Sequence, residues 1–247
     1  MNIMKAGAAV LGVLLATVGA QGFTIDFDAP GYATGSLHEQ GATATQWWCD
    51  ANGATIQVVT DPLDSGNQIA QTQYSGNPTS EWCYFVTSSD DLGFTLDKEN
   101  GTADFSVKFR KDAGSGGTRN MVLYVGYNNA TDGKFGTLQL YGNGGLQYTY
   151  GGGGEWLDEV PTTTWTEISG HVDYSTGMVT ITQDGVNKGS FAFQNPKETT
   201  GAEWLISVQN ANYGISVAMD DLAFTPEPAT MSLLTAGALG MLIRRKR

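Results

Sequence analysis

Apolar and polar residues alternate with a period of two through much of the chain between residues 23 and 224. The stretch Ala103 to Arg110 shows this best, because Phe105, Val107 and Phe109 are separated by polar residues. Such a period is that of a β-strand with one face in a core and the other toward solvent. No helical period of ordinary length occurs between residues 23 and 224, so the pattern predicts an all-β domain.

The other strand-like segments are separated by residues that favour turns. Met121 to Tyr127 is apolar on both faces, which predicts a place at the centre of a sheet. Gly142 to Gly145 and the pair Asp184-Gly185 predict tight hairpins, whereas Asp61 to Asn67 has the composition of a longer turn. The remaining predicted strands are Phe23–Asp28, Ala54–Thr60, Gln68–Tyr74, Glu81–Thr87, Phe135–Tyr141, Leu146–Tyr150, Trp165–Ile168, His171–Asp173, Met178–Gln183, Ser190–Phe193 and Ile215–Phe224.

The first twenty residues have the pattern of a secretory signal peptide. Lys5 supplies a positive charge, Ala6 to Val18 is apolar and uncharged, and Val18-Gly19-Ala20 offers small residues for cleavage. These features predict a signal helix over residues 1–20 and a mature chain that begins near Gln21. A retained N-terminal anchor is the alternative, and the shortness of the apolar stretch argues against it.

The other end of the chain combines three features in a fixed order. Pro226-Glu227-Pro228 precedes an apolar run of 15 residues, Ala229 to Ile243, and four cations follow: Arg244, Arg245, Lys246 and Arg247. The run is shorter than the ~20 residues that span a bilayer comfortably, but long cationic side chains can reach the far headgroups. Because cations prefer the cytoplasmic side, we expect a transmembrane helix with the bulk of the chain outside.

These features resemble the PEP-CTERM sorting signal of Gram-negative bacteria that make extracellular polymer. The resemblance implies that a membrane protease, an exosortase, recognises Pro226, Glu227 and Pro228 and removes or transfers the tail. It also implies an exported protein of the cell envelope or extracellular matrix, anchored transiently in the inner membrane through residues 225–247. An ordinary single-pass anchor is the alternative.

Charge excludes one class of partner. The chain has 13 basic and 25 acidic residues, and the two end signals hold five of the cations and one of the acids. The middle therefore keeps eight cations and 24 acids, a net charge of −16. A nucleic-acid-binding surface needs the opposite sign, so we expect no nucleic-acid partner.

The two cysteines, Cys49 and Cys83, both lie in the part predicted to be exported. An even pair in an oxidising compartment predicts one disulfide. Its closure would stabilise the fold by roughly 3–4 kcal/mol on the chain-entropy model. A catalytic cysteine is not predicted, because only His38 and His171 could act as its base and no triad pattern accompanies them.

A second resemblance lies in the C-terminal half. A strand led by Trp165, a turn at Thr176-Gly177, another strand and the Asp184-Gly185 hairpin are followed by a closing strand with Asp220-Asp221-Leu222. This order is similar to that of concanavalin A-like and laminin G-like domains. The resemblance implies a two-sheet antiparallel jelly-roll sandwich over residues 21–224, between the signal peptide 1–20 and the sorting tail 225–247. A generic β-sandwich is the alternative.

No residue is predicted to be catalytic. Glycosidases of the concanavalin-like class set paired carboxylates on a strand as Glu-x-Asp-x-x-Glu. The nearest sequence here is Glu155-Trp156-Leu157-Asp158-Glu159, whose aspartate is one position late and would face away from both glutamates. The glycines at 151–154 give this segment the composition of a loop. A glycan-cleaving enzyme, hydrolase or lyase, is the alternative to a non-catalytic protein.

Exposed aromatic rings are the candidate ligand-binding groups, because they stack on the apolar faces of sugar rings. The sequence therefore predicts a non-catalytic exported protein whose candidate partner is extracellular polysaccharide. Packing in the core is the alternative for each ring. The candidates are Trp47, Trp48, Trp82, Tyr84 and Trp156.

Neither a cofactor nor a metal site is predicted, and calcium is the one ion considered. Its oxygen ligands could come from Asp26 with Asp28, or from Asp220 or Asp221. Adjacent residues of a strand face opposite sides, so Asp220 and Asp221 are not expected to share an ion. We expect instead that these acids lie at sheet edges or face solvent and bind no calcium.

Overall fold

The computed structural model describes residues 23–28, 30–42, 45–49, 56–72, 81–88, 101–113, 119–127, 134–193, 203–210 and 216–226. Every regular element in these ranges is a β-strand, which confirms the predicted all-β class. The predicted signal helix and tail helix lie outside the described residues. Within those ranges the chain forms no helix long and apolar enough to cross a membrane.

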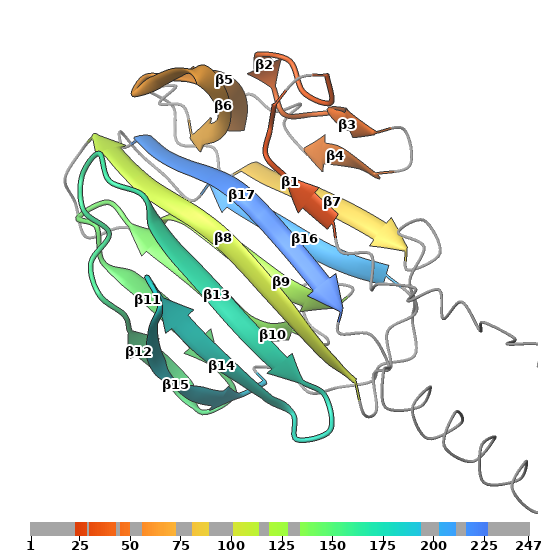
Figure 1. Cartoon of the computed structure of the whole chain (residues 1–247), viewed down its shortest axis with the longest axis vertical. Coiled ribbons are helices and arrows are strands. Elements are labelled where there is room, and N and C mark those ends of the chain that lie inside the picture. The colour runs from red at the N-terminus through yellow and green to blue at the C-terminus, as the bar shows by residue number, and fades with distance from the viewer. Residues whose placement is uncertain are drawn as a thin grey trace, which may run out of the picture.

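One layer is a nine-stranded antiparallel sheet (Figure 1). Its order is β15-β14-β13-β8-β17-β6-β5-β2, and β1 pairs with β17 further along than β6 does. The strands are β1 (Phe23–Ile25), β2 (Gly35–Ser36), β5 (Ile56–Asp61), β6 (Asp64–Thr72), β8 (Thr102–Ala113), β13 (Thr166–Asp173), β14 (Met178–Gln183), β15 (Val186–Ala192) and β17 (Ser216–Pro226).

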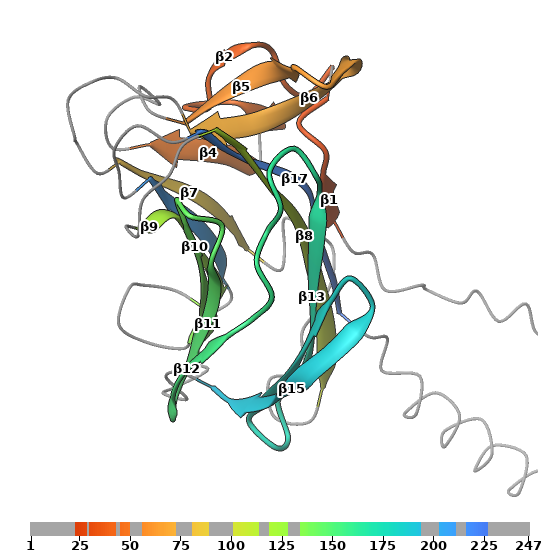
Figure 2. The ribbon, with the colours of Figure 1, turned by 90° about the vertical axis from the view of Figure 1, so that its left-hand side faces the viewer.

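The other layer is an eight-stranded antiparallel sheet with the order β12-β11-β10-β9-β16-β7-β4-β3. Figure 2 shows the layers from the side, with β9, β10 and β11 on one side and β8, β13 and β17 on the other. The inner position of β9 confirms the prediction made for Met121 to Tyr127. The strands are β3 (Gly41–Ala42), β4 (Thr45–Cys49), β7 (Glu81–Ser88), β9 (Arg119–Tyr127), β10 (Lys134–Tyr141), β11 (Leu146–Tyr150), β12 (Gly153–Trp156) and β16 (Glu203–Asn210).

The core lies between the two layers. Phe105, Val107 and Phe109 of β8 are buried there, as their alternation predicts, and they belong to one apolar cluster with Leu123 and Leu138 of the opposite sheet. The burial of alternate positions on both sheets is what makes two layers stable, since each sheet removes its apolar face from water against the other.

The hairpin predicted at Asp184-Gly185 joins β14 to β15. Both residues have positive φ, 47° and 77°, as a two-residue hairpin turn with the twist of its strands requires. Asp184 also holds the neighbouring strand, because its Oδ1 accepts a hydrogen bond from the backbone N–H of Glu167 at 2.9 Å. The predicted hairpin between β10 and β11 is confirmed as well.

The long turn predicted at Asp61 to Asn67 is wrong. The turn is only Pro62–Leu63, and Asp61 pairs with Asp64 across it at the ends of β5 and β6. Asp61 Oδ1 accepts a hydrogen bond from the backbone N–H of Leu63 at 2.8 Å, so a side chain closes the turn locally. The polar residues that follow continue as strand rather than loop.

Five strands were not predicted, and two of them, β2 and β3, are only two residues long. Strands β4 and β16 have apolar residues at consecutive positions, so the alternation that marks a half-exposed strand is weak in them. Strand β12 consists of two glycines, Glu155 and Trp156, which have loop-like composition, yet its register with β11 is regular. Its position at the edge of the sheet explains why all four residues are exposed.

The first and last strands of the described domain lie side by side. Phe23 of β1 pairs with Phe224 of β17, and Ile25 pairs with Leu222. On its other side β17 continues along β8 as far as the pairing of Pro226 with Ala103. The start of β1 and the end of β17 therefore lie at the same end of the sheet.

Candidate functional site

The outward side of the eight-stranded sheet carries two uncharged rows of residues, which we call the aromatic face. Outward is assigned from alternation, because Leu123, Leu138 and Tyr148 at the intervening positions are buried in the core. One row of successive register partners is Trp82, Gln209, Val122, Gln139, Gln147 and Trp156. The other is Trp48, Tyr84, Ser207, Tyr124, Thr137, Thr149 and Gly154.

The absence of charge from both rows sets this face apart within the chain. The protein has 25 acidic and 13 basic residues, yet every position in the two rows is aromatic, amide, hydroxyl, aliphatic or glycine. Aromatic and amide groups combine an apolar surface with directional hydrogen bonds. The composition therefore suits an uncharged, hydroxyl-rich ligand better than an ion.

Trp156 is the most exposed ring of this face among the side chains described. It retains 57% of its accessible surface, although it belongs to a regular strand. Its ring lies 5.0 Å from that of Tyr141, centroid to centroid, at a tilt of 50°. Tyr141 therefore supports one side of the indole, and the rest of the ring stays open to solvent.

Two amides lie beside this pair of rings. The Tyr141 hydroxyl is 3.4 Å from Gln139 Oε1 and 3.3 Å from Gln147 Oε1, so its proton bridges the two side chains. Gln139 Nε2 donates to Thr149 Oγ1 at 3.0 Å. Among the residues that the structure describes, Gln147 Nε2 has no acceptor, which leaves two N–H donors available next to the exposed ring.

Two glycines make room for these side chains. A Cβ atom on Gly145 would lie 3.2 Å from Cζ3 of Trp156, and one on Gly154 would lie 2.9 Å from Nε2 of Gln147. Either methyl group would displace the ring or the amide from its present place. The glycine-rich sequence around β12 thus serves the geometry of this face and not only the turns.

The structure divides the five predicted rings. Trp47 is a correction: it is completely buried, because it lies one position out of step with the outward rows. Its Nε1 donates to the Tyr32 hydroxyl at 3.2 Å, and its ring lies 6.2 Å from that of Phe27, so its role is packing. Burial raises the pKa of Tyr32 to about 12, which keeps that hydroxyl neutral.

The backbone register assigns the other four predicted residues to the outward rows. Trp156 is exposed there, and Trp48, Trp82 and Tyr84 occupy outward register positions on β4 and β7. The side chains of these last three lie outside the described part of the structure. Register thus unites residues that stand up to 108 positions apart, from Trp48 to Trp156.

Cys49 and Cys83 are direct partners in the ladder between β4 and β7. Directly opposed residues in antiparallel strands have Cα atoms about 4.5–5.5 Å apart, which is within the span that a disulfide requires. Their row is the inward one that contains Leu123 and Leu138. The disulfide stays a prediction that this register favours.

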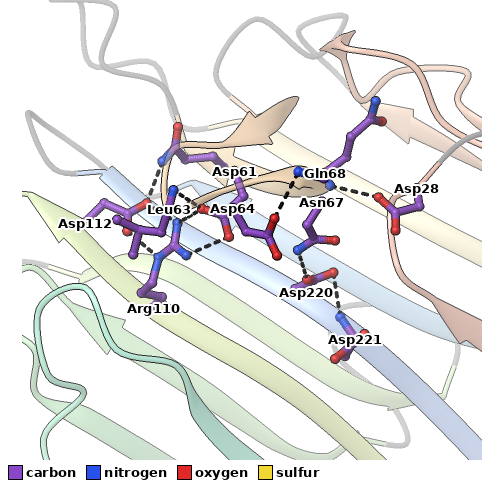
Figure 3. A network of polar contacts seen from close by, with 12 residues as sticks. Asp28, Asp61, Leu63, Asp64, Asn67, Gln68, Arg110, Asp112, Asp220 and Asp221 are labelled. Carbon is purple, nitrogen blue, oxygen red and sulfur yellow. Dashed lines mark hydrogen bonds and ion pairs between the residues drawn. The ribbon is translucent and has the colours of Figure 1, made fainter.

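The expectation of solvent-facing acids is wrong for Asp220. Asp220 is buried, and a bulge interrupts β17 directly after it, between Asp220 and Ala223, where Asp221 has a φ of 47°. Figure 3 shows Asn67 beside it: Asn67 Nδ2 donates to Asp220 Oδ2 at 2.9 Å. Burial raises the pKa of Asp220 to about 6.

The remaining acids considered for calcium have protein partners of their own. Asp221 pairs with Lys108 at 2.6 Å, Asp28 Oδ1 accepts the backbone N–H of Gln68 at 2.8 Å, and Asp26 Oδ1 accepts that of Asp28 at 3.1 Å. In the described ranges no three acidic, histidine or cysteine side chains come together as a metal site.

A buried ionic cluster that the sequence analysis did not predict lies around Arg110. Both terminal nitrogens of Arg110 donate to Asp61 at 2.8 Å, and its Nε donates to Asp112 at 2.5 Å (Figure 3). The ring of Trp165 lies 4.4 Å from the guanidinium carbon. We call these four residues the Arg110 cluster.

The charges of this cluster satisfy one another. Burial on its own would lower the pKa of Arg110, but its hydrogen bonds to Asp61 and Asp112 outweigh that effect and raise it. Burial would likewise raise the pKa of Asp61, and the hydrogen bond from Arg110 lowers it overall. Arg110 and Asp61 therefore stay ionised at neutral pH, and every guanidinium nitrogen already has an acceptor within the protein.

Two arrangements that resemble catalytic groups are incomplete. On the outward side of the nine-stranded sheet, His171 Nδ1 lies 2.8 Å from Asp104 Oδ1, beside a hollow of about 350 Å³ lined by serine and threonine. Among the described residues no serine hydroxyl bonds to this histidine, so a triad is not assembled. Strand β12 ends at Trp156, so Glu155 and Glu159 do not share a strand.

Comparison with known proteins bears on the tail and on the fold. Residues 224–247 match the PEP-CTERM protein-sorting motif. No curated protein matches the sequence as a whole. The predicted sorting signal is therefore confirmed.

Solved structures share the fold at low sequence identity. A carbohydrate esterase from the Shiga toxin-encoding bacteriophage phi24B superposes with a TM-score of 0.52 at 13% identity, over 74% of this chain and 90% of that one. Trypanosoma rangeli sialidase superposes with a TM-score of 0.53 at 13% identity, over 85% of this chain but only 30% of the sialidase. At such identities the likeness establishes the sandwich architecture alone.

The motif and the architecture agree with the two resemblances found in the sequence. The sorting motif indicates a protein that is exported to the cell envelope or the extracellular space and processed by an exosortase. The two antiparallel sheets and their structural neighbours confirm a jelly-roll sandwich. This chain is an exported jelly-roll protein that carries a PEP-CTERM sorting motif at its C-terminus.

Proposed function

We propose that this protein is a non-catalytic component of the cell envelope or extracellular matrix that binds polysaccharide on its aromatic face. The observation that carries the proposal is the row of register partners in which Trp156, Gln147 and Gln139 extend toward Trp82 on strands that are distant in sequence. An exposed indole offers a flat apolar surface, and the free amide of Gln147 offers donors for hydroxyl groups beside it.

The extended shape of the face favours a polymer. One row crosses six strands, from β7 to β12, and the other crosses seven, from β4 to β12, and neighbouring strands lie about 4.7–4.9 Å apart. A face of that length spans several sugar units, and each unit adds a small contribution to affinity. Transient anchoring of the protein in the inner membrane before processing is part of the same proposal.

A non-catalytic role accords with the chemistry on this face. Glycan cleavage by paired carboxylates requires two acids that flank one sugar ring, and neither outward row contains an acid. The Asp104–His171 pair lies on the other sheet.

Binding and release of sugar, measured together, test the proposal. The purified exported protein is applied to a glycan array that includes neutral polysaccharides. In a second assay, the same polysaccharides are incubated with the protein and new reducing ends are measured. We expect retention on neutral glycans without new reducing ends. Release of sugar would identify a glycan-cleaving enzyme, and no retention on any polysaccharide would overturn the binding role.

A further inference from the structure

The sorting motif begins inside the folded domain. Its match starts at residue 224, and Phe224, Thr225 and Pro226 are the last residues of β17. Phe224 is buried in the core, and Thr225 and Pro226 pair with Asp104 and Ala103 of β8. No linker therefore separates the sandwich from the first proline of the signal.

We propose that removal of the sorting tail breaks a peptide bond on the C-terminal side of Pro226, so that the mature protein keeps the whole of β17. This inference rests on the exosortase processing that the motif implies. In the hydrolysis, the hydroxyl of water joins the carbonyl carbon of the cut bond. The departing tail takes the second hydrogen of that water at its new amino group.

The first reason is access. A protease binds its substrate as an extended segment on both sides of the bond that it cuts, and a segment whose backbone already pairs with a neighbouring strand cannot enter such a cleft. Strand β17 lies between β8 on one side and β6 and then β1 on the other, so its backbone is paired on both sides near Phe224. The protease must therefore bind residues that follow the ladder.

The second reason is that Pro226 can end the ladder without loss. Proline has no backbone N–H to donate, and it occurs in sheets at edges and strand ends for that reason. The residue that opens the recognition motif is thus also one that can terminate β17. One residue serves both the fold and the signal.

The third reason is the cost of an earlier cut. A cut before Phe224 would remove a buried aromatic side chain from the core and the residue that pairs with Phe23 of β1. Loss of a buried phenylalanine side chain typically costs about 3–5 kcal/mol, a large fraction of the stability of a single domain. A protein trimmed that far would lose much of its free energy of unfolding.

The C-terminus of the mature protein tests the proposal. The full chain is produced in a bacterium that has its exosortase, and the processed form is analysed by intact mass and by mass spectrometry of its C-terminal peptide. We expect a C-terminus at Pro226 or later. A C-terminus at Thr225 or earlier would overturn the proposal, whereas a chain that keeps its tail would overturn exosortase processing together with it. Polysaccharide binding is measured separately, so its failure is distinct from either result.

An insertion variant sharpens the test. Ten Gly and Ser residues placed between Thr225 and Pro226 preserve the motif and move it away from β8. We expect the cut to move with the motif, so that the mature protein gains the mass of the insert, and processing to become several-fold faster. The same insert in the Asp184-Gly185 turn is the control and should change neither the cut position nor the rate. A cut within or before the insert at residue 225 would contradict the proposal.

Discussion

The Arg110 cluster and the aromatic face differ in how much of their hydrogen-bonding capacity is already used. In the Arg110 cluster, every nitrogen of the guanidinium donates to Asp61 or Asp112, and the group is shielded from water. On the aromatic face, Trp156 is exposed and Gln147 keeps free donors among the described residues. Satisfied and buried groups hold the fold, whereas exposed and unsatisfied groups are available to a ligand.

Mutations in the two regions should therefore differ in their effect on stability. Removing one member of a buried ionic cluster leaves the others desolvated and without a partner, which destabilises the whole domain. Removing an exposed ring changes little in the fold, because its surface was never taken out of water. Stability and binding should respond separately to changes in the two regions.

Replacement of the central cation should have the largest effect. Arg110→Ala leaves the Asp61 and Asp112 carboxylates without their hydrogen bonds, and we expect the free energy of unfolding to fall by about 3–5 kcal/mol. Denaturant unfolding measures this, with Lys111→Ala as the neighbouring control. A loss below about 1 kcal/mol would show that the Arg110 cluster does not stabilise the fold, contrary to the role assigned to it in the comparison with the aromatic face.

Reduction of the predicted disulfide should be nearly as costly. Cys49 and Cys83 are opposed in the inward row of the same two strands that carry Trp48 and Trp82. We expect a reducing agent, or Cys49→Ala with Cys83→Ala, to lower the free energy of unfolding by roughly 3–4 kcal/mol. Unchanged mobility of the oxidised and reduced protein on a non-reducing gel, with equal melting temperatures, would exclude the disulfide.

The exposed indole should matter for binding alone. We expect Trp156→Ala to weaken polysaccharide binding about tenfold, equivalent to ~1.4 kcal/mol, with the free energy of unfolding changed by less than about 0.5 kcal/mol. Val186→Ala is the matched control, because Val186 is equally exposed on an edge strand of the other sheet. Equal binding by both variants would remove the aromatic face from the proposal.

The neighbouring amide should contribute less than the indole. Gln147→Ala removes the free donors and one acceptor of the Tyr141 hydroxyl, and a hydrogen bond of this kind is worth about 0.5–1.5 kcal/mol. We expect binding to weaken about threefold in isothermal titration, within that range. Glu155→Gln, on the same edge of the sheet but outside the outward rows, should leave affinity unchanged.

The buried carboxyl of Asp220 should affect stability in a pH-dependent way. Its pKa is about 6 in the fold, above the ~3.9 of an unfolded chain, so the folded state binds the proton more tightly. Its contribution to stability is therefore complete below about pH 4 and is lost as the pH rises through about 6. We expect the melting temperature of the wild type to rise relative to that of Asp220→Asn as the pH falls from 7 to 5. If the difference in melting temperature between the two proteins does not change with pH, protonation of Asp220 is not the cause.

The alternation of apolar and polar residues predicted the strands that have one solvent-exposed face. The alternation in β8 and the turn at Asp184-Gly185 needed no knowledge of distant partners, and both were predicted from the sequence. Strands β16 and β12 were missed because the first is apolar at consecutive positions and the second is rich in glycine. In both cases tertiary pairing, not local preference, makes the strand.

The candidate site was harder to predict because it depends on register. Trp47 and Trp48 are adjacent in sequence and chemically identical, and only the pairing of β4 with β7 puts one in the inward row and the other in the outward row. The Arg110 cluster likewise needs Asp61, 49 residues earlier, to be brought to β8 by the β5–β6 hairpin. A shift of one residue in either ladder would exchange these roles.

The side-by-side position of β1 and β17 also sets how the mature molecule can be attached. Phe23 and Phe224 are neighbours, so a tether at either terminus would leave the domain from the same corner. Whichever terminus is held at the cell surface, the flat sides of the sandwich stay unobstructed by that attachment. Two such domains joined end to end would consequently meet corner to corner and keep both of their broad surfaces free.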